Sequence, residues 1–220
     1  MTKGAFGDSP FKHTLNKISP LNNMIKAIFF DMGNVLLKDG YTSGIKKYEE
    51  INSIESGRLY EAMHNRPYWK KFTLGLISEK KYFSSVEDNF KGALDIGDLR
   101  QIILANFIPN HEIANYIKTL KNYLITGIIS NNPKEWFECA MEKNGWDDIF
   151  KIKVVSGYVH IRKPDKEIFR YALEQTGITG QETIYVDDRD DRIQGALDNQ
   201  FNIIIYKDLE QLKKEIRKYI

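Results

Sequence analysis

Cysteine is almost absent from this 220-residue sequence, which contains Cys139 and no other. A single cysteine excludes an internal disulfide framework and a zinc site built from several thiolates. Long apolar runs are also missing, since none approaches the roughly 18 residues that a membrane-spanning helix needs. No charge sign dominates, because 32 Lys and Arg face 30 Asp and Glu. We therefore expect neither nucleic-acid nor membrane partners, and we expect Cys139 to be a small core residue.

The first 23 residues are polar, contain glycine and proline, and show no clear hydrophobic period. They lack the continuous apolar stretch of a secretory signal. We therefore expect residues 1–23 to be a flexible extension, with the fold beginning at Met24, and a cytoplasmic location follows by default. The remaining length accommodates one substantial α/β domain with a small inserted module.

Residues 24–39 begin the predicted core domain, because the apolar run at residues 27–30 is short, rich in strand-forming side chains and soon followed by a Gly-Asn pair. Residues 40–105 are charged and aromatic with helical spacing, which predicts an all-helical inserted domain. Helices are expected at 44–51, 56–65, 68–72, 79–92 and 98–107, with caps at Ser78 and Asp95. Four aromatic residues are expected to form the core of this insertion: Tyr68, Trp69, Phe72 and Tyr82.

Residues 106–220 complete the predicted core domain, in which helices and strands alternate. The expected strands are 123–130, 151–157, 182–188 and 201–206, and the expected helices are 111–122, 166–177, 192–199 and 209–220. Asn132 is predicted to cap a further helix that has Pro133 at its first position. This alternation predicts an α/β fold, a Rossmann-like parallel sheet covered by helices on both faces. The ligand site of such a sheet lies at the carboxyl ends of its strands.

Polar side chains of complementary chemistry stand at three predicted strand ends and in one loop: Asp31, Ser130 and Asn131, Lys163, and Asp187 and Asp188. A carboxylate can attack phosphorus and form an acyl phosphate. A hydroxyl and a lysine can hold the charged phosphoryl oxygens, and Mg²⁺ prefers oxygen ligands, commonly one or two carboxylates. Two adjacent acids at a buried strand end repel each other unless a cation compensates. This set therefore predicts phosphoryl transfer assisted by Mg²⁺.

The order and context of these residues resemble the four motifs of the haloacid dehalogenase (HAD) superfamily. FFDMGNV stands where the family has a strand ending in its nucleophilic aspartate, and LITGIISNN where a strand ends in serine or threonine. RKPDKEIF resembles the lysine motif, and TIYVDDRDDRIQGA the paired-acid motif. The helical segment matches the family's cap, and FTLGLISEKKYF is similar to caps of sugar-phosphate phosphatases and epoxide-hydrolase-linked phosphatase domains. The resemblance covers residues 25–206.

This resemblance implies a Mg²⁺-dependent phosphomonoester hydrolase that acts through an aspartyl-phosphate intermediate. Its substrate would be a small phosphorylated metabolite such as a sugar phosphate. Asp31 would be the nucleophile and a Mg²⁺ ligand, and the backbone carbonyl of Gly33 would be another ligand. Asp188 would bind the metal directly, and Asp187 would do so directly or through water.

The resemblance assigns the remaining motif residues to the transferring phosphoryl group. Ser130 and Asn131 would bind that group, while Lys163 would stabilise its charge and hold the nucleophile ionised. Asp190 and Asp191 are expected in the first turn of a helix, where the helix dipole favours acids. Asp191 is also a candidate for orienting Lys163.

One residue departs from the family pattern, because Gly33 replaces the second acid of the first motif. That acid normally protonates the leaving group and later activates water, help worth roughly 10²–10⁴-fold. We therefore expect the enzyme to favour leaving groups that need little protonation, such as an anomeric sugar oxygen or an acyl group. Asp39 and His160 are alternative proton donors.

Three other functions are compatible with parts of this pattern. A metal-independent 2-haloacid dehalogenase also lacks the second acid, but it lacks the paired acids at Asp187 and Asp188 as well. A catalytically weak HAD-like binding protein is supported by Gly33 alone. A phosphomutase needs the missing acid. The substrate and the oligomeric state are not determined by the sequence.

Overall fold

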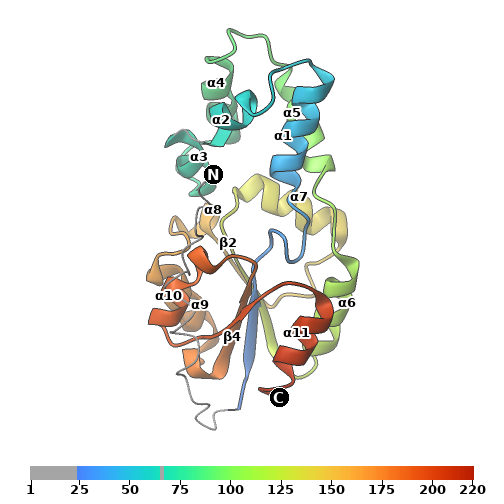
Figure 1. The fold of residues 1–220 in the computed structure, drawn as a ribbon. Helices are drawn as coiled ribbons and strands as arrows, with labels where there is room; N and C mark the ends of the chain where they lie inside the picture. The colour runs from blue at the N-terminus through green and yellow to red at the C-terminus, as the bar shows by residue number, and fades with distance from the viewer. Residues whose placement is uncertain (1–23, 65–66) are drawn as a thin grey trace, which may run out of the picture.

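The computed structural model describes residues 24–64 and 67–220, so the predicted extension at residues 1–23 lies outside the described residues. At its centre is a parallel sheet with the strand order β3-β2-β1-β4-β5 (Figure 1). The strands are β1 (Ala27–Phe30), β2 (Ile125–Ser130), β3 (Ile152–Val155), β4 (Thr183–Asp187) and β5 (Asn202–Ile205). Because β1 pairs with both β2 and β4, the carboxyl ends of these three strands adjoin at one edge of the sheet.

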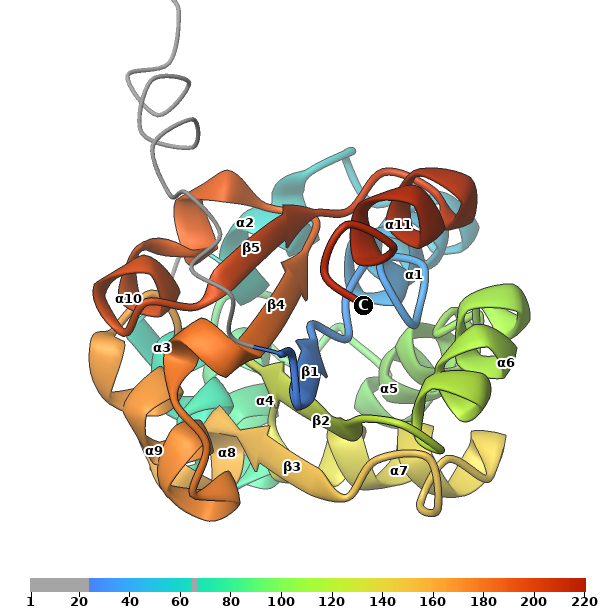
Figure 2. The ribbon, with the colours of Figure 1, turned by 90° about the horizontal axis from the view of Figure 1, so that it is seen from below.

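Each face of the sheet has its own hydrophobic core, because successive side chains of a strand point to opposite faces. Ile28 and Phe30 belong to the larger core, which the sheet shares with α6 (His111–Leu120), α7 (Lys134–Asn144) and α11 (Leu209–Ile216). Ala27 and Phe29 belong to the other core, with α9 (Lys166–Thr176) and α10 (Gln194–Asp198). Figure 2 shows these two groups of helices on either side of the strands. The predicted Rossmann-like α/β fold is confirmed.

Between β1 and β2 the chain forms a helical insertion, residues 40–105, which lies above the carboxyl edge of the sheet in Figure 1. Its helices are α1 (Gly40–Ile51), α2 (Arg58–His64), α3 (Pro67–Thr73), α4 (Glu79–Glu87) and α5 (Ile96–Ala105). Ser78 and Asp95 cap α4 and α5 as predicted, since each side chain accepts a bond from a backbone N–H of the first turn. No strand occurs among the described residues of this insertion.

Several predicted boundaries were wrong by a few residues. The helix expected at 79–92 ends at Glu87, and Lys91 and Gly92 take the left-handed conformation, which does not continue a helix. Helix α7 begins at Lys134, with Pro133 rather than Asn132 at its cap position. The side-chain amide of Asn132 instead donates to Ser130 Oγ at 3.0 Å.

Two predicted elements of the core are divided in the structure. The strand expected at 151–157 ends at Val155, and the chain continues as the short helix α8 (Ser156–Val159). The helix expected at 192–199 is preceded by a 3-10 turn, η3 (Asp190–Arg192), so the two acids at 190 and 191 lie in that turn and not in α10. A second 3-10 turn, η2 (Gly180–Glu182), leads into β4. No helix in the described part of the chain is long and apolar enough to cross a membrane.

An aromatic cluster joins the insertion to the core. Trp136 of α7 is buried, and its ring lies 5.8 Å from that of Trp69 and 5.5 Å from that of Phe72. Tyr82 stacks on Phe72 at 4.7 Å, which places three of the four predicted aromatic residues in this cluster. Tyr68 does not belong to it, because 36% of the residue is exposed and its ring lies near the Lys71 ammonium.

The loop that follows α3 is hydrogen-bonded to the core beside α8. Ser156 Oγ donates to the Thr73 carbonyl at 2.5 Å, and the Nδ1 atom of His160 lies 2.7 Å from the Leu74 carbonyl. Arg162 adds a bond from Nη1 to Thr73 Oγ1 at 3.1 Å. These contacts fix one side of the insertion over the edge of the sheet. Cys139 of α7 is partly buried against the larger core.

Because α1 packs closely on α5, adding one methyl group between them should lower the stability of the fold. A Cβ atom added at Gly44 would lie 2.6 Å from the Cα atom of Ile103. We expect Gly44→Ala to lower the free energy of unfolding by about 1–3 kcal/mol, because α1 and α5 must move apart. Urea denaturation followed by circular dichroism would measure this change. Gly97→Ala on α5 is the matched control, since its Cβ would meet only Asp95 Oδ1, at 3.3 Å. Equal stability of the two variants would contradict the prediction.

Candidate functional site

A pocket of about 310 Å³ lies between the carboxyl edge of the sheet and the helical insertion. Six predicted site residues line it: Asp31, Gly33, Ser130, Asn131, Lys163 and Asp188. Asp187 is fully buried and touches the pocket-lining Lys163. The insertion contributes aromatic residues to the opposite wall: Tyr41, Tyr60, His64 and Trp69. The structure thus brings together all seven residues that the motifs singled out.

Lys163 connects the two acidic strand ends. Its Nζ atom lies 2.9 Å from Asp31 Oδ1, 2.7 Å from Asp187 Oδ2 and 2.6 Å from the Tyr185 hydroxyl. The ammonium is almost completely buried. Burial alone would lower the pKa of Lys163, but the charges of Asp31 and Asp187 outweigh it and raise the pKa. Lys163 is therefore a permanent cation held between two carboxylates.

Asp31 stands directly after the central strand, and 13% of its side chain is exposed. Burial raises the pKa of Asp31 to about 6; the charge of Lys163 opposes this rise, and that of Asp187 adds to it. The backbone N–H of Met32 also donates to Asp31 Oδ1, at 2.7 Å. At neutral pH the carboxyl group is therefore mostly ionised and can act as a nucleophile.

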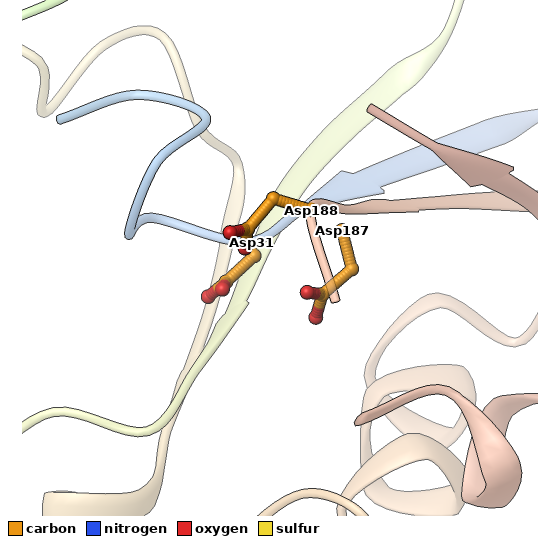
Figure 3. A group of neighbouring side chains, drawn as sticks. All are labelled: Asp31, Asp187 and Asp188. Atoms are coloured by element: carbon orange, nitrogen blue, oxygen red, sulfur yellow. The ribbon is translucent and has the colours of Figure 1, made fainter. Parts of the chain in front are cut away.

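Asp31, Asp187 and Asp188 come from the adjoining ends of β1 and β4 (Figure 3), and each offers an oxygen within 4.8 Å of the others. The oxygens of Asp187 are already engaged, Oδ2 with Lys163 and with Tyr185 at 2.5 Å, and Oδ1 with the backbone N–H of Arg189 at 3.0 Å. Asp188 Oδ2 accepts a bond from Asn34 Nδ2 at 3.0 Å, and burial raises the pKa of Asp188.

These donors fit Mg²⁺, which takes oxygen ligands and keeps several waters. Three carboxylates face one lysine, so the group carries excess negative charge that a divalent cation would balance. Asp31 and Asp188 have oxygens available for direct contact, with the backbone of Gly33 beside them in the pocket wall. The bonds that Asp187 already makes suit it better to a contact through water.

The side chains of Ser130 and Asn131 differ in what they can still bind. Ser130 is buried, and its Oγ accepts from Asn132, which leaves the hydroxyl hydrogen for another acceptor. The Asn131 side chain is used twice by Lys163: its Oδ1 accepts from the lysine's backbone N–H at 2.9 Å, and its Nδ2 donates to the lysine's carbonyl at 3.0 Å. This side chain therefore positions Lys163.

Three residues considered from the sequence have other roles. Asp191 is paired with Arg189 at 2.7 Å and has no contact with Lys163, so the suggestion that it orients the lysine is wrong, and Asp187 does so instead. His160 is bonded to the insertion and does not line the pocket. Asp39 lines the pocket, but its carboxylate caps α1.

Sequence reasoning missed three residues of the site: Tyr185, which bonds to Lys163 and Asp187, and the pocket residues Arg192 and His64. Tyr185 precedes Asp187 by two residues on β4, so both point to the same face of the sheet, a signal that was available. Arg192 and His64 line the pocket as well. Arg192 lies within the paired-acid motif, which assigned it no role. His64 lies in no motif, and the periodicity of the insertion does not specify which way its helix faces.

Comparisons with known proteins agree with this geometry. A family model described as haloacid dehalogenase-like hydrolase matches residues 25–198. The pyrimidine 5'-nucleotidase YjjG of Escherichia coli (strain K12) is 26% identical over 160 residues, 68% of this chain and 71% of the relative. The glyceraldehyde 3-phosphate phosphatase of Pyrococcus furiosus is 28% identical over 183 residues, 75% of this chain and 73% of the relative.

A solved structure has the same fold. It is a HAD family enzyme of Bacteroides thetaiotaomicron in complex with magnesium and inorganic phosphate, with a TM-score of 0.69 and 18% identity. The similarity covers 86% of this chain and 98% of that one. Because the family model spans well over half of the sequence, the chain belongs to the haloacid dehalogenase-like hydrolases.

Proposed function

We propose that this hydrolase is a Mg²⁺-dependent phosphomonoesterase that uses Asp31 as a covalent nucleophile on a small phosphorylated metabolite. The observation that carries this proposal is the Lys163 ammonium held between Asp31 and Asp187, with Asp188 beside them. A cation next to a nucleophilic carboxylate suits attack on a negatively charged phosphoryl group. Curated relatives named as phosphatases and a nucleotidase support the same reaction class.

In the proposed first step, an Asp31 oxygen attacks phosphorus, the bond to the ester oxygen breaks, and the leaving alcohol oxygen takes a proton from water. An acyl phosphate results. Lys163 and the Ser130 hydroxyl would bind the equatorial phosphoryl oxygens. In the second step, water attacks phosphorus and restores the Asp31 carboxylate, releasing inorganic phosphate. Mg²⁺, when bound by Asp31, Asp188 and the Gly33 carbonyl, would neutralise charge on the phosphoryl oxygens.

The helical insertion, residues 40–105, would act as a cap that covers the site and selects the substrate, while residues 24–39 and 106–220 form the catalytic core. Its aromatic residues Tyr41, Tyr60 and Trp69 line the pocket away from the strand ends. A sugar phosphate is the first substrate class to test, because one relative is named for a triose phosphate. The three clustered carboxylates favour this chemistry over metal-independent dehalogenation.

We expect phosphate release from a panel of phosphomonoesters to require both Mg²⁺ and Asp31. Asp31→Asn keeps the shape of the side chain but removes its nucleophilic charge, so turnover should fall to background. Colorimetric phosphate release, with and without EDTA, would measure the effect. Thermal unfolding would verify that the variant is folded. Release that survives in Asp31→Asn would contradict the mechanism, and no release from any ester by folded wild type would favour the dehalogenase or binding-protein alternatives.

We also expect Mg²⁺ to stabilise the folded protein, because the cation offsets repulsion among Asp31, Asp187 and Asp188. At a concentration of about 100 times its Kd, linkage predicts a gain of about 2.7 kcal/mol. Scanning calorimetry with Mg²⁺ or EDTA would show this as a rise in Tm. The rise should be mostly lost in Asp188→Asn and kept in the matched variant Asp190→Asn, whose side chain is exposed and outside the acidic group. The same rise in both variants would place the metal elsewhere.

Restoring the missing acid should increase turnover of esters with poor leaving groups. A Cβ atom at Gly33 would meet nothing within 4 Å, so the backbone there has room for the first atom of an aspartate side chain. General acid catalysis is worth roughly 10²–10⁴-fold, and we expect a gain of at least about tenfold in kcat on alkyl phosphates. Gly33→Asn has the same shape without an acidic proton and is the control. The wild type should favour acidic leaving groups, so a flat dependence of its rate on leaving-group acidity would count against this explanation.

A further inference from the structure

We propose that the pocket contains a second anion-binding subsite, formed by Arg192 of the core and His64 of the insertion. The substrate would then be a phosphomonoester that carries a further acidic group, either a carboxylate or a second phosphate. This inference rests on the proposed phosphatase function and narrows its substrate class. Both side chains line the same pocket as Asp31 and Lys163.

Arg192 has a charge that its surroundings do not neutralise. Among the described residues, the nearest carboxylate oxygen is Asp191 Oδ2, 3.9 Å from Nε. That carboxylate already accepts two hydrogen bonds from Arg189, at 2.8 and 2.7 Å. Arg192 Nη1 donates to the Lys163 carbonyl at 3.4 Å, so the guanidinium lies beside the catalytic lysine. Only 23% of the side chain is exposed, and a partly buried guanidinium is well suited to a carboxylate or phosphate.

The other cations near Arg192 either have carboxylate partners of their own or add to its positive charge. Lys163 is shared by Asp31 and Asp187. Arg189 is paired with Asp191. Arg162 is half-buried and donates to a neutral hydroxyl, and its pKa is lowered by burial and by the charge of Arg192. Two guanidinium groups therefore repel each other in a partly buried place. An anion in the pocket would relieve this repulsion.

His64 provides an independent observation from the insertion. Its Nδ1 atom is buried and has no hydrogen-bond partner among the residues that the structure describes, although buried polar atoms are generally paired. Burial lowers the pKa of His64, and so do the charges of Arg192 and Arg162. The ring is therefore neutral at pH 7. Its one N–H would donate a hydrogen bond to an acidic group bound by Arg192. Tyr60 stacks on this ring at 5.0 Å and limits its orientation.

The size of the pocket limits the rest of the substrate. Its volume of about 310 Å³ is at the lower end of the usual range for ligand pockets, roughly 300–1,000 Å³. One acidic group would lie at Asp31 and Lys163, the other at Arg192 and His64. A short carbon skeleton between them would pack against the aromatic wall of Tyr41 and Trp69.

Matched substrate pairs test this inference. 3-Phosphoglycerate differs from glycerol 3-phosphate by a carboxylate in place of a hydroxymethyl group, and fructose 1,6-bisphosphate differs from fructose 6-phosphate by a second phosphate. We expect kcat/KM to be at least about tenfold higher for the more acidic member of one pair, as a charge-assisted hydrogen bond would give. The pair that responds identifies the second group.

Variants then assign this preference to Arg192. Arg192→Gln should bring the ratio of the two kcat/KM values close to one, and Arg192→Lys should keep part of it. Lys38→Gln removes an exposed cation that lines the same pocket, and its ratio should equal that of the wild type. A wild-type ratio near one in both pairs would overturn the inference. So would an Arg192→Gln variant that slows both members of a pair equally, since the arginine would then bind the transferring phosphoryl group.

A binding measurement separates this inference from the proposed function. Calorimetry with Asp31→Asn in Mg²⁺ would compare the Kd of 3-phosphoglycerate with that of glycerol 3-phosphate, and likewise the fructose esters, without turnover. Tighter binding of an acidic member that disappears when Arg192→Gln is added supports the subsite. Equal binding within both pairs refutes it. If wild type hydrolyses no ester, including p-nitrophenyl phosphate, the phosphatase proposal fails while these binding data still decide the subsite.

Discussion

The ion pairs of Lys163 with Asp31 and Asp187 are the contacts on which the architecture of this site depends. Three carboxylates gather at the ends of β1 and β4, and like charges at such distances oppose folding unless cations separate them. Lys163 reaches both strand ends at 2.9 and 2.7 Å. Asn131 fixes its backbone from the end of β2. Three adjacent strands therefore meet at one lysine: β1 and β4 at its ammonium group, and β2 at its backbone.

The three carboxylates differ in what they contact: one is bonded to Lys163 and fully buried, and two line the pocket. Asp187 is fully buried and bonded to Lys163, Tyr185 and a backbone N–H, so it serves the lysine. Asp31 and Asp188 line the pocket, and each offers an oxygen that could hold a metal ion where negative charge remains in excess. A buried ion pair contributes little net stability, because desolvation offsets its attraction. The network is better understood as one that fixes Asp31, the proposed nucleophile, in place and leaves room for a divalent cation.

The sheet and the residues at its edge were predictable, since buried apolar strands alternate with amphipathic helices and ligands collect at strand ends. The side-chain contacts between different elements were less predictable. Asp191 has the same side chain as Asp187, but it pairs with Arg189 and not with Lys163. Asn132 bonds to Ser130 instead of capping α7. Tyr68 is aromatic like its neighbours in the sequence, but it is exposed to solvent. Hydrophobic period gives the spacing of side chains along an element and leaves their partners undetermined.

The loop after β4 would link the proposed metal site to the choice of substrate. Asp188 directly follows β4, and Arg192 ends the 3-10 turn four residues later. Arg192 Nη1 is bonded to the backbone carbonyl of Lys163, so the loop is tied to Lys163 as well. Any shift of η3 would move the proposed subsite relative to the phosphoryl position. The spacing between the two acidic groups of a substrate would therefore be set by the core, and the insertion would select the carbon skeleton between them. A change of skeleton through substitutions in the insertion at positions other than His64 should thus leave the requirement for two acidic groups intact.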